Sequence, residues 1–272
     1  MKHITIQIRK RHLLLVAVLM VVSVGGRASD FDSTRVVHSA EIRAGASFTK
    51  HFDHHINLSL EEEIRSQVYN SYDNPSYFHR SYTSVELSYK PVSYFSMRAG
   101  YTLRLLGNHG WDDPKEFMRH RGTIALTGHY KTRDWTFSLR ERLDMDGRMD
   151  SVNTNEKSRV DVRLRHRLYA AYSIPSKPLK VFGTVELINT LNQPFEYVNK
   201  RLGTSYGQYL SDARIRLGIR WKIDKSNAVN FSYRFAYSKD YDVNITKKKG
   251  YVELYRQTGF EHLIGINYEF DW

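Results

Sequence analysis

The sequence contains no cysteine among its 272 residues, which excludes both disulfide bonds and a lipid-modified N-terminal cysteine. It also lacks long hydrophobic runs: beyond residue 24, no apolar stretch approaches the roughly 20 residues that a membrane-spanning helix needs. The mean hydropathy of −0.54 is low for a membrane protein. However, the strands of a membrane β-barrel are apolar on one face only, so averaging along the sequence hides their signal. A chain without spanning helices can therefore still belong in a membrane.

The N-terminus has the pattern of a cleaved secretory signal. Its basic segment contains Lys2, Arg9, Lys10 and Arg11. An apolar run follows at 13–24, interrupted only by Ser23, and it is too short to span a bilayer. Small residues at 25–29 offer a cleavage site, for which we choose the bond after Ala28, with Gly26 and Ser29 as alternatives. We therefore predict a signal peptide at 1–28 and a barrel at 29–272. Cleavage lowers the net charge from +12 to +7, because five basic and no acidic residues are removed.

Strict alternation of apolar and polar residues marks the last segment of the sequence. Ile264, Ile266, Tyr268, Phe270 and Trp272 share one face, and small or polar residues occupy the other. This pattern is typical of the closing strand of a bacterial outer-membrane β-barrel. We therefore expect the barrel-assembly machinery to recognise the segment from Ile264 to Trp272.

Earlier segments show the same two-residue period, and each is about as long as the 9 to 11 residues with which a tilted strand crosses a bilayer. With the last one, the segments are 36–49, 55–68, 83–89, 95–105, 120–131, 135–143, 159–172, 179–187, 212–223, 229–237 and 262–272. Single-chain bacterial barrels have even strand numbers. We therefore predict an all-β, transmembrane, antiparallel up-and-down β-barrel of twelve strands, with ten as the alternative. A missing strand would lie at 30–37 or 250–256.

The connections between these segments alternate in length. Short turns at 50–53, 91–93, 132–134, 174–178 and 224–226 alternate with long polar loops at 70–81, 107–116, 144–158, 189–211 and 239–261. In outer-membrane barrels the short turns are periplasmic and the long loops are external. Trp135 and Trp221 adjoin short turns, so with Trp272 they would form an aromatic girdle at the periplasmic interface. The pattern predicts a protein of the outer membrane of a Gram-negative bacterium.

Two other classes of protein fit the sequence less well. A soluble secreted β-sandwich would also alternate, but it would need neither the regular change between short and long connections nor a terminal aromatic strand. A pI of about 9.7 suggests nucleic-acid binding. The basic residues, however, recur at period two opposite an apolar stripe, without a recognition helix or an RNA-binding signature, so we expect no nucleic-acid partner.

Four stretches carry a resemblance to a known family: LSLEEEIR at 58–65, LSYKPVSYFSMRAGYTLR at 87–104, RLRHRLYAAYSIP at 163–175 and RIRLGIRWKIDKSNAVNFSYRF at 214–235. Through them the chain from Ser33 to Trp272 resembles the uncharacterised barrel family of Bacteroidetes-type bacteria catalogued as domain of unknown function 2490. The resemblance implies an outer-membrane β-barrel. It implies no particular reaction and no catalytic residues.

Charged residues opposite the apolar faces would point into the lumen, and arginines outnumber carboxylates among them. They are Glu41, Arg43, Glu61, Glu63, Arg65, Glu86, Arg98, Arg104, Arg140, Arg142, Asp161, Arg163, Arg165, Arg167, Glu186, Asp212, Arg214, Arg216, Arg220 and Arg234. One interpretation is a structural filling, in which guanidinium and carboxylate groups pair across a narrow bore. The other is a narrow anion-selective pore, since rings of arginine favour anions. The filling is the favoured account, because unpaired buried charge is costly.

A lipid-modifying hydrolase of the outer membrane is an alternative function. Glu62, Glu141 and His166 interrupt apolar faces and His120 precedes another, although charged residues that face lipid are costly. Positions near the headgroup boundary or in an oligomer contact would also explain them, and no nucleophile accompanies them at a fixed spacing. We therefore favour a protein without enzymatic activity, cofactor or metal.

The loops suggest a third function, the surface binding of sugars or proteins. Aromatic residues gather around the loop at 70–81: Tyr69, Tyr72, Tyr77, Phe78 and Tyr82. An external aromatic girdle would explain them equally well. The basic run from Lys247 to Lys249 could contact lipopolysaccharide phosphates, although a solvated loop tip is the simpler interpretation. The expected partners are thus outer-membrane lipid and lipopolysaccharide, and we expect a monomer.

Overall fold

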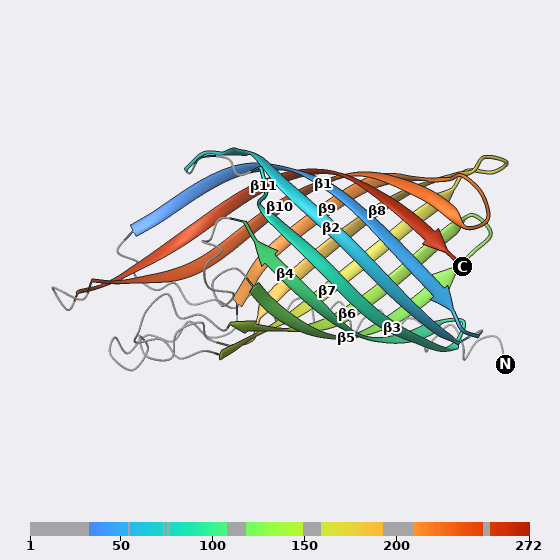
Figure 1. Cartoon of the computed structure of the whole chain (residues 1–272), viewed down its shortest axis with the longest axis horizontal. Helices are drawn as coiled ribbons and strands as arrows, with labels where there is room; N and C mark the ends of the chain where they lie inside the picture. Colours follow the sequence, from blue (N-terminus) through green and yellow to red (C-terminus); the bar gives the residue numbers. More distant parts are fainter. Residues whose placement is uncertain are drawn as a thin grey trace, which may run out of the picture.

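The computed structural model of the chain describes residues 33–53, 55–72, 74, 77–107, 118–148, 159–192, 209–246 and 251–272, so the predicted signal peptide lies outside the described residues. These residues form one closed β-barrel whose strands are strongly tilted against its long axis (Figure 1). The described part of the chain contains eleven strands: β1 Ser33–His51, β2 Ile56–Asn70, β3 Arg80–Val92, β4 Phe95–Leu106, β5 Met118–Lys131, β6 Trp135–Arg148, β7 Arg159–Ser173, β8 Leu179–Thr190, β9 Tyr209–Lys222, β10 Asn227–Thr246 and β11 Tyr251–Asp271. Across the same residues, no helix is long and apolar enough to cross a membrane.

The predicted number of twelve strands is wrong for this barrel, and so is the alternative of ten. At the two places suspected of holding a further strand, the described residues 33–37 and 251–256 instead form the starts of β1 and β11. The barrel closes because β1 and β11 pair in parallel, from Ser33↔Tyr255 to Thr49↔Asp271, whereas the other neighbouring strands pair antiparallel. Purely antiparallel closure requires an even strand number, but one parallel pair allows an odd number, as occurs in a mitochondrial barrel.

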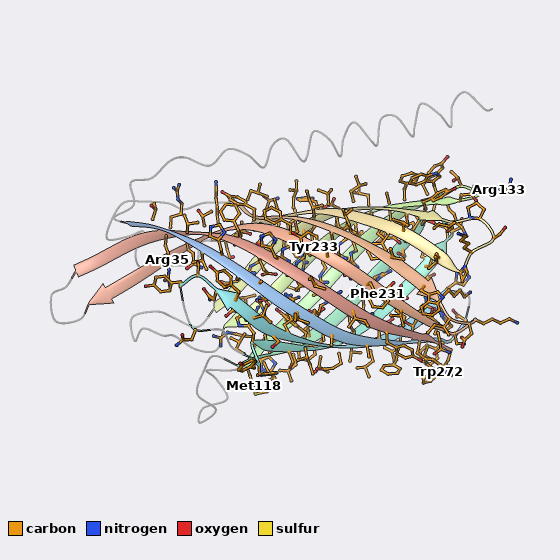
Figure 2. The ribbon with its side chains drawn as sticks, turned by 90° about the horizontal axis from the view of Figure 1, so that it is seen from above. Arg35, Met118, Arg133, Phe231, Tyr233 and Trp272 are labelled. Atoms are coloured by element: carbon orange, nitrogen blue, oxygen red, sulfur yellow. The ribbon has the colours of Figure 1, made fainter. Side chains whose placement is uncertain are left out.

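β10 and β11 continue beyond the other strands as a long hairpin, which projects from the end of the barrel opposite the C-terminus (Figures 1 and 2). Their antiparallel pairing extends to Thr246↔Tyr251. The long loop predicted at 239–261 is therefore wrong, because the strands leave only 247–250 between them. Apolar and polar residues still alternate at 241–246, so the strand pattern continues past the wall of the barrel.

Side chains alternate between an apolar outer surface and a polar interior. The outer positions are mostly β-branched or aromatic, which suits strands, and Ile264 and Leu217 are 65% and 60% exposed there. Phe231 and Tyr233, labelled in Figure 2, belong to the same outer face. The buried positions, in contrast, include charged side chains such as Glu41, which is 3% exposed. The barrel thus reverses the arrangement of a soluble globular protein, in which charged residues are rarely buried.

The short connections are tight, hydrogen-bonded turns. In the turn after β9, Asp224 accepts hydrogen bonds from the backbone N–H groups of Ser226 and Asn227, each at 2.8 Å. These bonds, together with those from the side-chain amide of Asn227, lower the pKa of Asp224. Asp53 plays a similar part before β2, since its carboxylate accepts the backbone N–H groups of His55 and Ile56. These two turns are thus each held by a local aspartate, as is common for tight loops.

The three tryptophans of the predicted girdle lie at the end of the barrel that carries the short turns. Trp135 begins β6, Trp221 is the second last residue of β9, and Trp272 follows β11. Figure 2 places Trp272 at this end together with Arg133, which belongs to a short turn. The indole side chains are about half exposed on the outer surface. They therefore form part of a band of exposed aromatic residues around this end.

Cross-linking tests the parallel closure directly. Ala44 of β1 pairs with Ile266 of β11, and the chain has no native cysteine. The double substitution Ala44→Cys with Ile266→Cys should form one intramolecular disulfide on mild oxidation, because neighbouring strands about 4.8 Å apart fall within the range that a disulfide spans. The cross-link is measured as a shift in non-reducing gels. Ala44→Cys with Phe260→Cys is the control and should stay reduced; cross-linking of this pair instead would contradict the register.

Candidate functional site

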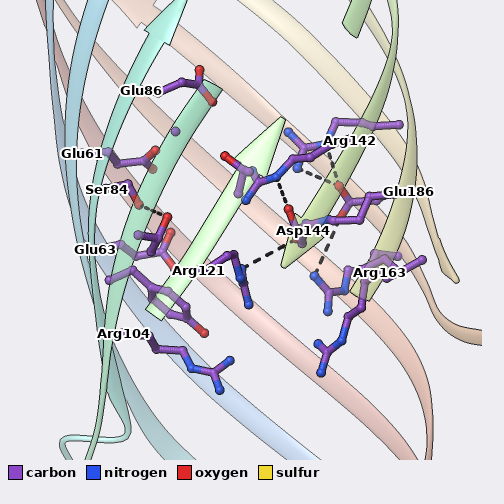
Figure 3. A pocket seen from close by; sticks show the side chains of 18 of the residues that line it. Glu61, Glu63, Ser84, Glu86, Arg104, Arg121, Arg142, Asp144, Arg163 and Glu186 are labelled. Atoms are coloured by element: carbon purple, nitrogen blue, oxygen red, sulfur yellow. Dashed lines mark hydrogen bonds and ion pairs between the residues drawn. The ribbon is translucent and has the colours of Figure 1, made fainter. Parts of the chain in front are cut away.

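Two adjoining cavities occupy the lumen of the barrel. The loop-end cavity, toward the long connections, has a volume of about 450 Å³, and the turn-end cavity, toward the short turns, has a volume of about 490 Å³. Figure 3 shows side chains of the loop-end cavity, with Asp144 and Glu186 on one wall and Glu61 and Glu63 on another. Every second residue of each strand points inward, so the charged residues of neighbouring strands converge here.

Three carboxylates and four arginines form a continuous ion-pair network on the wall made by β1, β2, β3, β10 and β11. Arg65 links Glu41 and Glu63, at 3.5 and 2.6 Å. Arg80 links Glu41 and Glu261, at 2.5 and 3.5 Å. The remaining pairs are Arg43 with Glu63, at 3.0 Å, and Arg234 with Glu261. A planar guanidinium has several donors and can bridge two carboxylates, so this network ties five strands together.

A second network covers the other part of the wall, from β5 to β9. Asp144 is 2% exposed and lies 2.5 Å from Arg142 and 3.1 Å from Arg165 (Figure 3). Glu186 lies 2.8 Å from Arg165 and 2.8 Å from Arg167, so Arg165 joins the two carboxylates. Further pairs are Arg121 with Asp146, Arg214 with Glu186 and Arg214 with Asp212. Charge-assisted bonds of this kind are the stronger hydrogen bonds of proteins, and here they fix the lumen side chains in place.

Three lumen arginines lie apart from these networks. In the described part of the chain, no carboxylate oxygen lies within 4.0 Å of Arg104, Arg140 or Arg216. Arg216 instead lies over the ring of Phe182, with its guanidinium carbon 5.6 Å from the ring centroid. Glu61 likewise forms no ion pair with a described residue, and in Figure 3 no dashed line reaches Glu61 or Arg104. Positive charge is therefore only partly neutralised within the lumen.

The two cavities meet at a set of shared side chains that we call the arginine ring: Arg43, Glu61, Arg98, Arg140, Arg167, Thr184 and Arg216. It contains five arginines and one carboxylate. Glutamates outside the ring neutralise three of the arginines, in the pairs Arg43 with Glu63, Arg98 with Glu86 and Arg167 with Glu186. No described carboxylate pairs with Arg140 or Arg216, so the ring is a place in the lumen suited to attract an anion.

Glycines on the inner face make room for large lumen side chains. A Cβ atom added at Gly265 would lie 2.8 Å from Nε of Arg43, so the side chain of Arg43 packs directly against Gly265. At Gly218 an added Cβ would lie 2.5 Å from Cζ of Phe182 and 2.6 Å from the backbone oxygen of Phe231. The positions of Arg43 and Phe182 thus depend on the absence of a side chain on the neighbouring strand.

The predicted lumen residues lie on the inner face of the wall. Those that line the cavities are Arg43, Glu61, Glu63, Arg65, Glu86, Arg98, Arg104, Arg140, Arg142, Arg163, Arg165, Arg167, Glu186, Arg214, Arg216, Arg220 and Arg234. Glu41 and Asp212 do not line a cavity, and their carboxylates pair with Arg80 and Arg214 behind the cavity surface. Asp161 precedes Arg163 by two residues in β7, so the two share one face of the strand.

Tyr82, Asp144 and Glu261 are among the lumen residues that the sequence prediction missed. Tyr82, which the sequence groups with an external aromatic patch, lines the loop-end cavity, and the guanidinium carbon of Arg65 lies 4.9 Å from its ring centroid. Asp144 and Glu261 fall in segments predicted as loops, yet both belong to strands and carry ion pairs. The two-residue period continues from Arg142 to Asp144, and this signal could have placed Asp144 in the lumen. Tyr69, Tyr72 and Tyr77 are exposed, whereas Lys247 to Lys249 lie outside the described residues.

The structure brings two of the four candidate catalytic residues together on the outer face. His166 Nδ1 lies 2.5 Å from Glu141 Oε2, across β6 and β7. Leu126 and Leu187 flank this pair in register on the adjacent strands, so no nucleophile stands beside it there. The other two candidates have separate partners: Thr83 donates to Glu62 at 2.5 Å, and Tyr101 contacts His120 at 2.6 Å. The four residues therefore do not form one site. Within the described ranges, no group of three or more His, Asp or Glu could hold a metal ion.

Comparison with known proteins gives a family and a structural neighbour. Residues 44–244 match the model of the family described as "Protein of unknown function (DUF2490)". The chain belongs to this family, which confirms the resemblance of the four sequence stretches. A solved structure described as "NanC porin structure in rhombohedral crystal form" is similar with 14% sequence identity and a TM-score of 0.40, over 72% of this chain and 86% of that chain. No curated protein matches the chain significantly.

Removal of the central carboxylate tests the ion-pair network of β5 to β9. Asp144→Asn keeps the shape of the side chain but leaves Arg142 and Arg165 without the charge that they share. We expect the free energy of unfolding to fall by about 3 kcal/mol, because loss of one partner leaves uncompensated charge in a buried site. Urea titration of the detergent-folded protein, followed by tryptophan fluorescence, measures it. Asp212→Asn is the matched control, since Arg214 is the one ion-pair partner of Asp212 among the described residues, and it should cost no more than about 1 kcal/mol. Equal losses would contradict the central role of Asp144.

Proposed function

We propose that the chain is an outer-membrane β-barrel whose lumen is a narrow, anion-selective pore. The arginine ring is the observation that carries this proposal, since two of its five arginines, Arg140 and Arg216, have no described carboxylate partner where the two cavities meet. An anion is attracted to such a ring and a cation is repelled, and the walls of a narrow passage strengthen both effects by excluding bulk water.

The outer surface supports placement in a membrane. Large apolar side chains are exposed along the strands, from Val36 of β1 to Ile264 of β11. An exposed apolar area of this extent marks a membrane or protein contact rather than a surface in water. The band that contains Trp135, Trp221 and Trp272 resembles the aromatic girdle at a membrane interface.

The finer features of this proposal concern export and orientation. A signal peptide at 1–28 would deliver the chain to the periplasm, where assembly machinery would recognise the segment from Ile264 to Trp272. The short turns would then face the periplasm, and lipopolysaccharide of a Gram-negative cell would surround the other end. We propose a monomer without a nucleic-acid partner.

A purely structural barrel with a filled lumen is the second candidate function. The two ion-pair networks favour it, since most lumen arginines already have carboxylate partners, such as Asp144 and Glu186. Such a filling would stiffen the wall without allowing solutes to pass. The pore and the filling differ in one measurable property, the conductance of the lumen.

Planar-bilayer recording tests the pore. Single channels with a reversal potential that shows chloride to be more permeant than potassium are expected, because the arginine ring attracts anions. Arg216→Glu should lower the chloride-to-potassium permeability ratio several-fold. Arg133→Gln, which removes one positive charge from a short turn outside the lumen, is the control and should leave the ratio unchanged. Absence of conductance steps would favour the filled barrel, and cation selectivity would contradict the proposed role of the ring.

Thiol labelling tests the orientation in the membrane. Because β1 runs parallel to β11, the start of β1 lies at the end opposite the short turns, and the side chain of Thr34 is exposed there. In intact cells, Thr34→Cys should react with a maleimide whose attached polymer is too large to cross the outer membrane. Lys225→Cys, in the exposed turn after β9, is the matched variant and should react only after the outer membrane is permeabilised. The reverse labelling pattern would overturn the orientation.

A further inference from the structure

The arginine ring carries two arginines without described carboxylate partners, both on the part of the wall from β6 to β9. Arg140 extends from β6, and Arg216 extends from β9. Arg167 of β7 pairs in register with Arg140, but its guanidinium is held 2.8 Å from Glu186. All three arginines line both cavities. An oxyanion at this place would meet two guanidinium groups that no described carboxylate neutralises.

A row of hydroxyl groups crosses the same wall one step nearer to the short turns. Ser138 of β6 pairs with Tyr169 of β7, which pairs with Thr184 of β8, which in turn pairs with Arg216 of β9. Each of these residues lines the turn-end cavity. Among the described residues, the hydroxyls of Ser138 and Thr184 have no hydrogen-bond partner. The row thus offers neutral hydrogen-bonding groups beside the positive charges.

The combination of charge and hydroxyl groups defines a class of ligand. A simple inorganic anion would use the arginines alone, whereas a ligand with its own hydroxyl groups would use the row as well. The ring of Tyr169 is stacked on Phe182, with centroids 6.1 Å apart, and adds an apolar surface for a carbon skeleton. The turn-end cavity of about 490 Å³ falls within the range of small-molecule sites.

We infer that the arginine ring and the hydroxyl row together form a binding site for a small hydroxylated organic anion. Arg140 and Arg216 hold its carboxylate or phosphate group, and Ser138, Tyr169 and Thr184 bind its hydroxylated body. This inference rests on the proposed function, because it names the class of solute that the lumen selects.

Glu61 sets a limit on how tightly this site holds its ligand. It is the carboxylate of the ring, and it forms no ion pair with another described residue. In its ionised form Glu61 repels the same anion that the arginines attract. A conducting site must bind strongly enough to admit a solute and weakly enough to release it. Glu61 therefore favours release, and its removal should strengthen binding.

Calorimetry on the full-length protein in detergent tests the site independently of conduction. The probes are D-glucuronate and glucose 6-phosphate, which carry a carboxylate and a phosphate on the same kind of body, with glucose and inorganic phosphate as references. We expect at least one sugar anion to bind about tenfold more tightly than either reference. Comparison of the two anions shows whether the site prefers a carboxylate or a phosphate group. Each anion should also block current through the pore in the planar bilayer. Absence of binding by both sugar anions at millimolar concentrations would overturn the inference.

Matched variants locate the site within the lumen. Arg140→Gln and Arg216→Gln should each weaken binding of the sugar anion about tenfold. Arg104→Gln is the control, since Arg104 also lacks a described carboxylate partner but lines only the loop-end cavity, and it should leave affinity unchanged. Glu61→Gln should strengthen binding. Heat-modifiable migration in gels verifies that each variant is folded.

Further outcomes distinguish this site from the pore itself. Ser138→Ala with Thr184→Val should weaken binding of the sugar anion while leaving inorganic phosphate unaffected. Equal losses for Arg104→Gln and Arg216→Gln, or equal affinity for sugar anion and phosphate, would contradict the site. Conduction of chloride without binding of a sugar anion would refute the site alone. Binding without conduction would refute the pore and leave the site in place.

Discussion

Pairing between guanidinium and carboxylate groups across the lumen is the interaction on which this barrel depends. The two-residue period of a strand sends Arg142 and Asp144 to the same face, and neighbouring strands bring Arg165 and Glu186 beside them. Burial of so many arginines without partners would oppose folding. Because each guanidinium can bridge two carboxylates, two networks neutralise most of the charge and join strands that are not adjacent in sequence.

Parallel closure follows from a different constraint, the need to leave no open edge. Unpaired strand edges leave backbone donors and acceptors without partners and invite pairing with other chains, so the eleventh strand pairs with the first. With an odd number, that pair is parallel. The arrangement places the start of β1 beside the projecting hairpin of β10 and β11, and it brings Glu41 of β1 close enough to Arg80 to share that arginine with Glu261 of β11. Closure and charge pairing therefore support each other.

The sequence predicts the features that follow from the two-residue alternation of apolar and polar residues. It does not predict the features that depend on contacts between segments far apart in the sequence. Alternation locates the strands, and the closed all-β barrel and its family are confirmed. The eleven alternating segments match the eleven strands, but the predicted number of twelve was wrong, because the rule of even strand numbers assumes antiparallel closure and the parallel pairing of β1 with β11 leaves no local pattern in the sequence. Glu261 was missed because its polar surroundings are typical of a loop, although its strand continues through them. The spacing of residues along the sequence does not show which arginines lack carboxylate partners. That depends on side-chain geometry, as for Arg140 and Arg216.

Filling and selectivity need not be opposing accounts of the same lumen. The paired arginines hold the wall rigid, and a rigid wall is what keeps Arg140 and Arg216 at fixed positions between the two networks. If every arginine had a carboxylate partner, the lumen would be neutral and would not discriminate between ions. If none had, mutual repulsion would destabilise the barrel. A small excess of arginine, which includes Arg140 and Arg216 in the ring where the cavities meet, satisfies both requirements. The charge that remains after pairing is then the charge available to a solute.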